Sequence, residues 1–153
     1  MTSMQAVNDL YAGLSEQVRN ELARHEETAT LPRGTKLVQP GIAPDHLIIL
    51  ESGTAETSVE ARGKHLSLGV FGPGHVFALH SIVSRELPHT TVTCVEDCEV
   101  TMLPSQVFLE ILERHPQIYV VVAKVLSADL AKADHLLRDH ARSRKVRPGR
   151  RAC

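Results

Sequence analysis

A chain of 153 residues is long enough for one domain with a buried core and too short for two domains with a linker. Hydrophobic residues make up 42%, charged residues 23%, and the formal net charge is −1, which is typical of a soluble globular protein. The longest apolar run, 118–123, is shorter than the ~20 residues that cross a bilayer, and residues 1–14 lack the features of a signal peptide. We therefore expect a cytoplasmic protein that makes no membrane contact.

The first predicted element is a short helical lead-in over residues 9–27. Leu10, Leu14, Val18 and Leu22 follow each other at intervals of four residues, which is typical of one apolar helix face. Ser15 stands where a new helix could begin, because a serine side chain can accept a hydrogen bond from a free backbone N–H in the first turn. The pattern predicts one or two short helices ahead of the main body.

From Leu31 to Leu103 the sequence changes to short apolar stretches separated by Gly and Pro. This spacing predicts a compact all-β roll or barrel. In residues 55–60 and 66–70 apolar and polar side chains alternate, so two half-buried strands joined by the Arg62-Gly63 turn are expected. We predict a meander without parallel crossovers, and its other strands are Lys36–Val38, His46–Leu50, Thr91–Val95 and Glu99–Leu103.

Two helices are expected after the strands. Ser105 is the candidate N-cap of a helix to about Arg114, and Pro116 opens a longer one to about Arg142. Apolar positions in the longer helix repeat at steps of four and three, which is typical of a coiled-coil seam. We predict a homodimer through this helix, and packing of the stripe on the chain's own roll is the alternative. The expected interface residues are Leu126, Leu130, Ala133 and Leu137.

The end of the chain is a separate electrostatic unit. From Arg138 onward seven Lys and Arg residues accompany one Asp, a net +6, whereas residues 1–137 carry −7. We expect one domain over residues 1–142 and a basic, disordered tail over 143–153, which could bind phosphate backbones non-specifically or an acidic partner. The residues after the long helix are too few for a recognition domain, so no DNA-binding domain is expected in this chain.

Cysteine usage gives little support for a metal centre. Cys94, Cys98 and Cys153 are an odd and sparse set, which is typical of a reducing compartment rather than a disulfide framework. Structural zinc sites add a second ligand pair at suitable spacing, and none accompanies Cys94 and Cys98. We expect buried thiols and no bound metal.

Several strings, in this order, carry a family resemblance: Leu31-Pro32-Arg33-Gly34-Thr35, then Gly41 with Asp45-His46-Leu47-Ile48-Ile49-Leu50 and Ser52-Gly53, then Phe71-Gly72-Pro73-Gly74-His75-Val76-Phe77. With the order helix, β-roll, short helix and long helix, they resemble the cyclic-nucleotide-binding domain of the catabolite activator protein and related Crp/Fnr-type regulators. The resemblance covers residues 10–140. It implies a mainly β fold with flanking helices, a double-stranded, jelly-roll-like β-roll followed by a short helix and a long dimerisation helix. It also implies a regulatory ligand-sensing function in signal transduction or transcription.

The resemblance also places a ligand site. The family's phosphate-binding cassette has Phe-Gly-Glu-Leu, a short helix and Pro-Arg-Ser/Thr-Ala, where this chain has Phe77-Ala78-Leu79-His80 and Pro88-His89-Thr90-Thr91. Leu79 replaces the Glu that binds the ribose and His89 replaces the Arg that binds the cyclic phosphate. Losing two charged hydrogen bonds, each worth about 1.5–3 kcal/mol, predicts that tight cyclic AMP binding is lost. The implied ligand residues are Ala78, Leu79, His80, Ser81, His89, Thr90 and Thr91.

Three kinds of ligand or activity remain as alternatives. A nucleotide or another small anion is the first, since Ser81 and Thr90 keep hydroxyls and the short helix could offer backbone N–H groups. A haem-based gas sensor is the second and less favoured, because His75, His80 and His89 lie near the cassette. A cupin-like enzyme is the third, but that site needs His-x-His, which the chain lacks, and no other catalytic motif stands out. We expect no enzyme activity.

Overall fold

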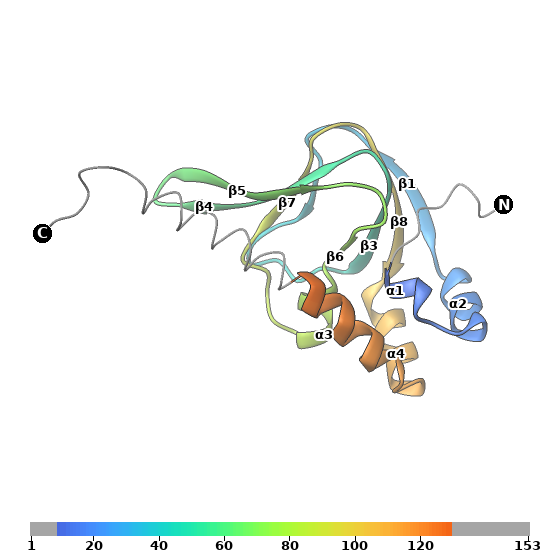
Figure 1. Ribbon diagram of the computed structural model, residues 1–153. Helices are drawn as coiled ribbons and strands as arrows, with labels where there is room; N and C mark the ends of the chain where they lie inside the picture. Colours follow the sequence, from blue (N-terminus) through green and yellow to red (C-terminus); the bar gives the residue numbers. More distant parts are fainter. Residues whose placement is uncertain (1–8, 130–153) are drawn as a thin grey trace, which may run out of the picture.

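The computed structural model describes residues 9–129 and shows two four-stranded antiparallel sheets that face each other as a roll, with helices gathered at one side (Figure 1). One sheet has the strand order β1-β8-β3-β6 and the other β2-β7-β4-β5. The strands are β1 (Glu27–Leu31), β2 (Lys36–Val38), β3 (His46–Ser52), β4 (Ala55–Ala61), β5 (Lys64–Phe71), β6 (Val76–Phe77), β7 (Thr91–Cys94) and β8 (Cys98–Pro104). The predicted fold class, a jelly-roll-like β-roll with flanking helices, is confirmed.

The predicted meander is wrong, although every strand pair is antiparallel as expected. Only β4 and β5 are neighbours both in sequence and in a sheet. The other strands alternate between the two sheets, because each of the short Gly- and Pro-containing connections carries the chain across the roll instead of reversing it in place. Two strands were also missed: β1, which directly follows the helical lead-in, and β6, which has only two residues.

The helices are α1 (Asp9–Ala12), α2 (Glu16–Ala23), α3 (Leu79–Ser84), α4 (Ser105–Arg114) and a helix over residues 118–129 that we call the C-terminal helix. Ser15 is the N-cap of α2, as predicted, and its hydroxyl accepts a hydrogen bond from the Val18 N–H. Ser105 is instead the first residue of α4, with Pro104 in the cap position. None of the described helices is long and apolar enough to cross a membrane.

Strand β3 separates two hydrophobic clusters. Its alternate side chains point to opposite faces, and Leu47 and Ile49 pack with the helices while Ile48 and Leu50 pack between the sheets. All four are buried, which explains the unbroken apolar run in a strand with both faces covered. The helical cluster includes Leu22, Phe108, Ile111, Leu112 and Ile118. This double layer holds the helices against the end of the roll where the candidate site lies.

The β4–β5 hairpin departs from simple alternation. The pairing shifts by one residue between Thr57 and Ser58, and the extra residue lies on β5. Ser58 is buried although it stood on the predicted polar face. Because of the shift, Leu66 and Val70 stand on opposite faces of β5 rather than on one apolar face, and they are 46% and 58% exposed. The predicted half-buried pattern is therefore wrong for β5.

A contact between the lead-in and the later helices fixes the N-terminal segment. Glu21 on α2 accepts hydrogen bonds from Arg114 and from the His115 ring, whose Nε2 lies 3.2 Å from Glu21 Oε1. Partial desolvation would raise the pKa of Glu21, but the Arg114 and His115 hydrogen bonds outweigh it and lower that pKa. The carboxylate therefore stays ionised at neutral pH and ties α2 to α4.

Candidate ligand-binding pocket

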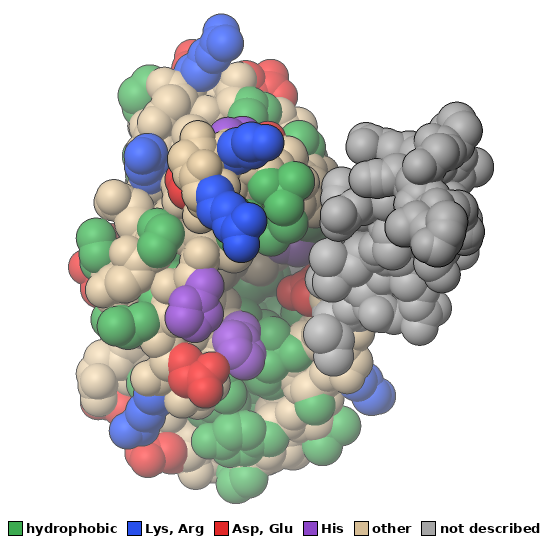
Figure 2. Space-filling view, turned by 90° about the vertical axis from the view of Figure 1, so that its left-hand side faces the viewer, with side chains coloured by type: hydrophobic (Ala, Val, Ile, Leu, Met, Phe, Trp, Pro, Cys, Tyr) green, Lys and Arg blue, Asp and Glu red, His purple; other side chains and the backbone are tan. Residues whose placement is uncertain are grey.

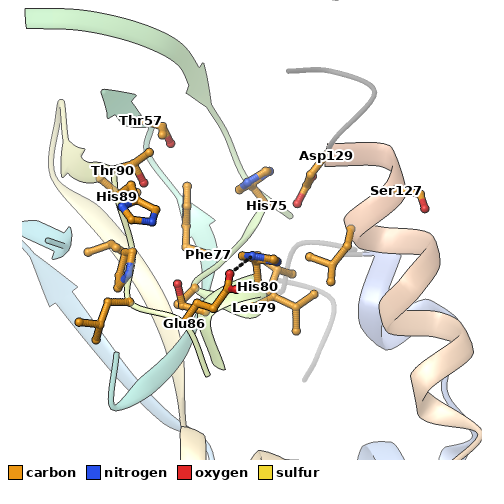
Figure 3. Close-up of a pocket in the computed structure, with 18 residues that line it drawn as sticks. Thr57, His75, Phe77, Leu79, His80, Glu86, His89, Thr90, Ser127 and Asp129 are labelled. Atoms are coloured by element: carbon orange, nitrogen blue, oxygen red, sulfur yellow. Dashed lines mark ion pairs between the residues drawn. The ribbon is translucent and has the colours of Figure 1, made fainter. Parts of the chain in front are cut away.

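A pocket of about 720 Å³ lies between β6, α3, the segment 86–90 and the C-terminal helix. This is within the range of about 300–1,000 Å³ that is common for small-molecule sites. Figure 2 shows a hollow with hydrophobic side chains on its floor and histidine side chains at its margin. The lining residues are Val38, Thr57, His75, Val76, Phe77, Ala78, Leu79, His80, Ser81, Glu86, Leu87, Pro88, His89, Thr90, Val92, Leu126, Ser127 and Asp129 (Figure 3).

The backbone at both ends of α3 is left-handed. Ala78, the N-cap, has φ 76° and Arg85, the C-cap, has φ 63°. Such angles cost an L-residue about 1–2 kcal/mol, because Cβ approaches the backbone oxygen. In the described chain only one other non-glycine residue, Arg62, has a positive φ. The family's glycine at the place of Ala78 thus has a physical reason, and α3 is held by neighbouring packing rather than by its own preference.

The floor of the pocket is apolar and aromatic. Phe77 and Leu79 are both buried, with Phe77 in the cluster between the sheets and Leu79 in the helical cluster. The His75 ring stacks on Phe71 with centroids 4.2 Å apart and lies 4.5 Å from the Phe77 centroid. These rings form a rigid wall against which a flat ligand could pack.

Polar groups surround this floor. The His80 ring and the Glu86 carboxylate form an ion pair at 3.4 Å, joining α3 to the segment that closes the pocket (Figure 3). His89 is exposed, whereas its neighbour Pro88 is buried and anchors the segment. Hydroxyls come from Thr57, Ser81 and Thr90. Among residues 9–129, no lysine or arginine lines the pocket.

Six of the seven predicted ligand residues line this pocket, and the exception is Thr91. Thr91 begins β7, where it pairs with Ser58 of β4. Of the predicted dimer residues, Leu126 is half-buried, packs against the helical cluster and also lines the pocket. The other three, Leu130, Ala133 and Leu137, lie outside the described residues. The structure therefore brings the cassette residues together. For Leu126 the intramolecular packing agrees with the alternative that the stripe packs on the chain's own roll.

Some lining residues escaped the sequence analysis. Thr57 lines the pocket from β4, on the strand face that the alternation predicts to be inward, but no local signal in the sequence brings β4 beside the cassette. Asp129 comes from the C-terminal helix, 39 positions beyond the last predicted lining residue, Thr90. Glu86 stands inside the cassette, and its charge is opposite to that of the family's arginine. This difference is a sequence signal from which Glu86 could have been predicted as a pocket residue.

The described residues hold no group of three or more His, Cys, Asp or Glu side chains placed to bind a metal ion. Cys94 and Cys98 are both buried free thiols. Burial, the Cys98 hydrogen bond and nearby negative charge raise the pKa of Cys94 to about 12. That thiol stays protonated at neutral pH, so it is a packing residue rather than a reactive one.

An antiparallel roll, a short helix beside a concave apolar pocket and a following helix at its mouth are an arrangement that is typical of domains with a small-molecule pocket. Residues 28–115 match the family described as cyclic nucleotide-binding domain, so the chain belongs to that family. The family is one of regulatory ligand-binding domains, and the fold is that of Crp/Fnr-type regulators.

Similar solved structures agree on the fold. The catabolite activator protein of Thermus thermophilus is 22% identical with a TM-score of 0.73, over 88% of this chain and 63% of that one. The regulatory domain of Toxoplasma gondii PKA, solved with cAMP, is 25% identical with a TM-score of 0.65, over 68% and 40%. The sensor domain of the transcriptional regulator DNR from Pseudomonas aeruginosa is 18% identical with a TM-score of 0.69, over 80% and 83%. The chain thus spans less than two thirds of the first two proteins. Among curated proteins, none matches it in sequence.

Proposed function

We propose that this chain is a non-catalytic, ligand-sensing regulatory domain whose pocket receives one small molecule. The observation that carries the proposal is a pocket of about 720 Å³ at the place of the family's cassette, with an apolar floor and a few convergent polar groups. The C-terminal helix contributes Leu126, Ser127 and Asp129 to the pocket wall. A bound molecule would therefore touch both the roll and the helix that leads out of the domain.

The altered cassette favours a ligand other than cyclic AMP. Leu79 offers no acceptor for a ribose hydroxyl, and His89 lacks the forked donors of an arginine. Cyclic nucleotides and other small anions remain weak candidates through Ser81, Thr90 and His89. Haem is a second candidate because three histidines, His75, His80 and His89, line one apolar pocket.

A thermal-shift screen tests the proposal. Cyclic nucleotides, nucleosides, sugar phosphates and haem are added, because a ligand that binds only the folded state raises the unfolding midpoint. Ser81→Trp fills the pocket and should abolish the shift. Ser84→Trp is the matched control, since it lies on the same helix, is exposed and does not line the pocket. A shift that survives Ser81→Trp, or no shift with any ligand, would contradict the proposed site.

We also propose that the chain forms a homodimer through the C-terminal helix. Leu130→Asp would place a charge in the apolar seam and should therefore give monomers. Sedimentation at tens of micromolar, about the concentration at which a dimer of moderate affinity is assembled, measures this. Lys124→Asp is the control, because Lys124 is exposed and stands off the seam. If the unmodified protein is a monomer, the dimer proposal is wrong and the apolar stripe packs on the chain's own core.

The boundary between domain and tail is part of the proposal. Residues 1–142 should carry the stability, and deletion of 143–153 should leave the thermal midpoint nearly unchanged, because a Gly-, Pro- and Arg-rich end contributes little burial. A large drop in the midpoint would show that the tail docks on the domain.

A further inference from the structure

A second cavity lies where the end of α3 meets one face of α4, two helices that pack side by side (Figure 1). It is a groove of about 350 Å³ lined by Arg85, Gln106, Leu109, Glu110 and Glu113. The four lining residues of α4 occupy positions i, i+3, i+4 and i+7, which places them on one side of the helix. The groove shares no lining residue with the ligand pocket, so a role for it does not depend on the proposed ligand-sensing function.

The two walls of the groove carry opposite charges. Arg85 is the C-cap of α3, and its backbone N–H donates to the Ser81 carbonyl, which fixes the point from which its side chain extends. Glu110 and Glu113 extend from α4 on the other wall, and all three charged residues are exposed. Among the ion pairs of residues 9–129, none joins Arg85 to either glutamate. The cation and the carboxylates therefore line one space without direct contact.

The other contacts in the groove leave these charges available. Gln106 donates from its side-chain amide to Glu110 Oε2 at 3.5 Å, a long contact that occupies only one of the carboxylate lone pairs. Within the described part of the chain, the Arg85 guanidinium and the Glu113 carboxylate have no side-chain partner. Leu109 is half-buried, packs against the helical cluster and adds apolar surface to the groove.

We propose that this groove binds a zwitterion, namely a free amino acid with an apolar side chain. The ligand carboxylate accepts the forked N–H donors of Arg85, and the ammonium group donates to Glu110 and Glu113. The apolar side chain lies along Leu109. A free amino acid carries both charges on one carbon, whereas in a peptide chain neutral amides replace them, so the groove favours the free amino acid over a protein partner.

Three compounds with the same side chain separate the two charges: leucine is a zwitterion, N-acetyl-leucine keeps only the carboxylate and leucinamide keeps only the ammonium group. NMR titration of the full chain at pH 6.5 and about 0.15 M salt follows the backbone amides of Arg85 and of residues 105–114. Leucine should shift these amides with a Kd on the order of a millimolar, because exposed charged contacts are weak. The other two should bind at least about fivefold more weakly, because each lacks one of the two charged contacts.

Variants of single walls should affect the two half-ligands in opposite ways. Arg85→Gln should weaken leucine and N-acetyl-leucine by at least about threefold and leave leucinamide no weaker. Glu110→Gln with Glu113→Gln should weaken leucine and leucinamide to a similar extent and leave N-acetyl-leucine no weaker. Arg62→Gln and Glu99→Gln are the controls, because they remove the same charges from exposed positions that line neither cavity. Both should keep all three Kd values.

Several results would overturn the proposal. They are no shift of these amides at about 20 mM leucine, an unchanged leucine Kd in Arg85→Gln, or equal Kd values for the three compounds. Shifts confined to Ser81 and Thr90, which line the larger pocket, would place leucine there and also contradict the groove. None of these results decides whether the larger pocket senses a ligand, which the thermal-shift screen tests separately.

Discussion

Two turns of this protein need a left-handed backbone and meet the need differently. At the β3–β4 turn the residue is glycine: Gly53 has φ 90°, and a Cβ there would lie 2.5 Å from the Asp97 carbonyl oxygen. At the cassette the residues are Ala78 and Arg85, which hold φ values of 76° and 63° on either side of α3. At the β3–β4 turn the residue type suits the left-handed backbone, whereas at the two ends of α3 it does not.

This difference indicates where the sequence serves stability and where it serves the site. In the scaffold, turn residue, strand pattern and core packing agree, as expected for a sequence that specifies one fold. In the pocket wall the surroundings force α3 into place against local preference, which is common at ligand sites. Substitutions at the two turns should therefore change stability in opposite directions.

The largest effect is expected at the scaffold turn. Gly53→Ala should lower the free energy of unfolding by about 2–5 kcal/mol, because it combines the cost of a left-handed Ala with a clash against backbone. Gly63→Ala is the control, since Gly63 has φ 76° but no atom within 4 Å of an added Cβ. It should cost only about 1–2 kcal/mol. Urea unfolding measures both variants. If they lose the same free energy of unfolding, the close approach of the Asp97 carbonyl oxygen to Gly53 is unimportant.

The opposite sign is expected at the pocket wall. Ala78→Gly should raise the free energy of unfolding by about 1 kcal/mol, because glycine adopts this φ without steric cost. Part of the gain is offset by the greater freedom of glycine in the unfolded chain. Ala23→Gly in α2, where the backbone is right-handed, should lower stability instead. If Ala78→Gly is also destabilising, the cassette does not hold the strain inferred for it.

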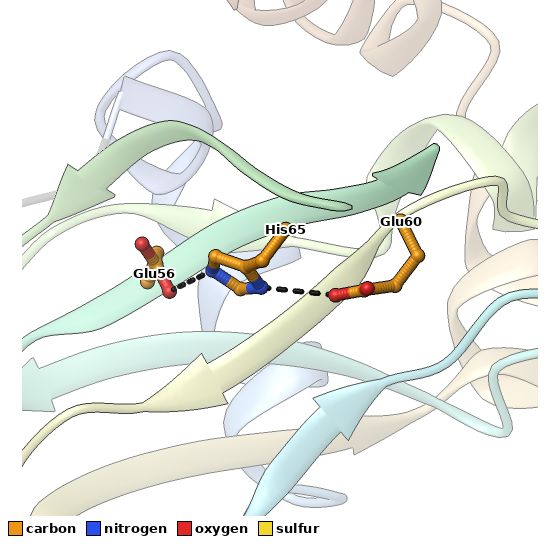
Figure 4. Close-up of polar contacts among 3 residues, drawn as sticks. All are labelled: Glu56, Glu60 and His65. Carbon is orange, nitrogen blue, oxygen red and sulfur yellow. Dashed lines mark hydrogen bonds and ion pairs between the residues drawn. The ribbon is translucent and has the colours of Figure 1, made fainter. Parts of the chain in front are cut away.

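The smallest effect is a pH dependence in the exposed hairpin. His65 donates to Glu60 Oε2 at 3.0 Å and to Glu56 Oε1 at 3.2 Å, and these contacts raise the pKa of His65 (Figure 4). A raised histidine pKa stabilises the fold below the unfolded-state value, about 6.5, and that contribution disappears as the pH rises through the folded-state value. His65→Gln should therefore lower the thermal midpoint at pH 5.5 and leave it nearly unchanged at pH 8.5. A larger loss at pH 8.5 would contradict this assignment.

The sequence predicted the fold well where the pattern is local. The strands β2, β3, β4, β5, β7 and β8 and the helix α4 lie close to their predicted bounds, because alternation and turn residues mark them directly. The order of strands in the sheets was not predictable in this way, since pairs such as β1 with β8 join residues about 70 positions apart.

The candidate site was predicted in part for the same reason. The cassette residues are close in sequence and follow a family pattern, and six of them line the pocket. Thr57 and Asp129 reach it through the pairing of β4 with β7 and the return of the C-terminal helix, which no local pattern specifies. The family pattern gave the position of the site, but its ligand chemistry depends on these distant residues.

The central claim is that this domain binds a ligand in a pocket that has lost the fixed positive charge for a phosphate. Calorimetric titration with cyclic AMP, on the unmodified protein and on His89→Arg, tests it most directly. We predict weak binding by the unmodified protein and a Kd at least about tenfold tighter for His89→Arg, because the arginine fork restores a charged hydrogen bond to the phosphate. Tight binding by the unmodified protein, with no gain in His89→Arg, would contradict the claim.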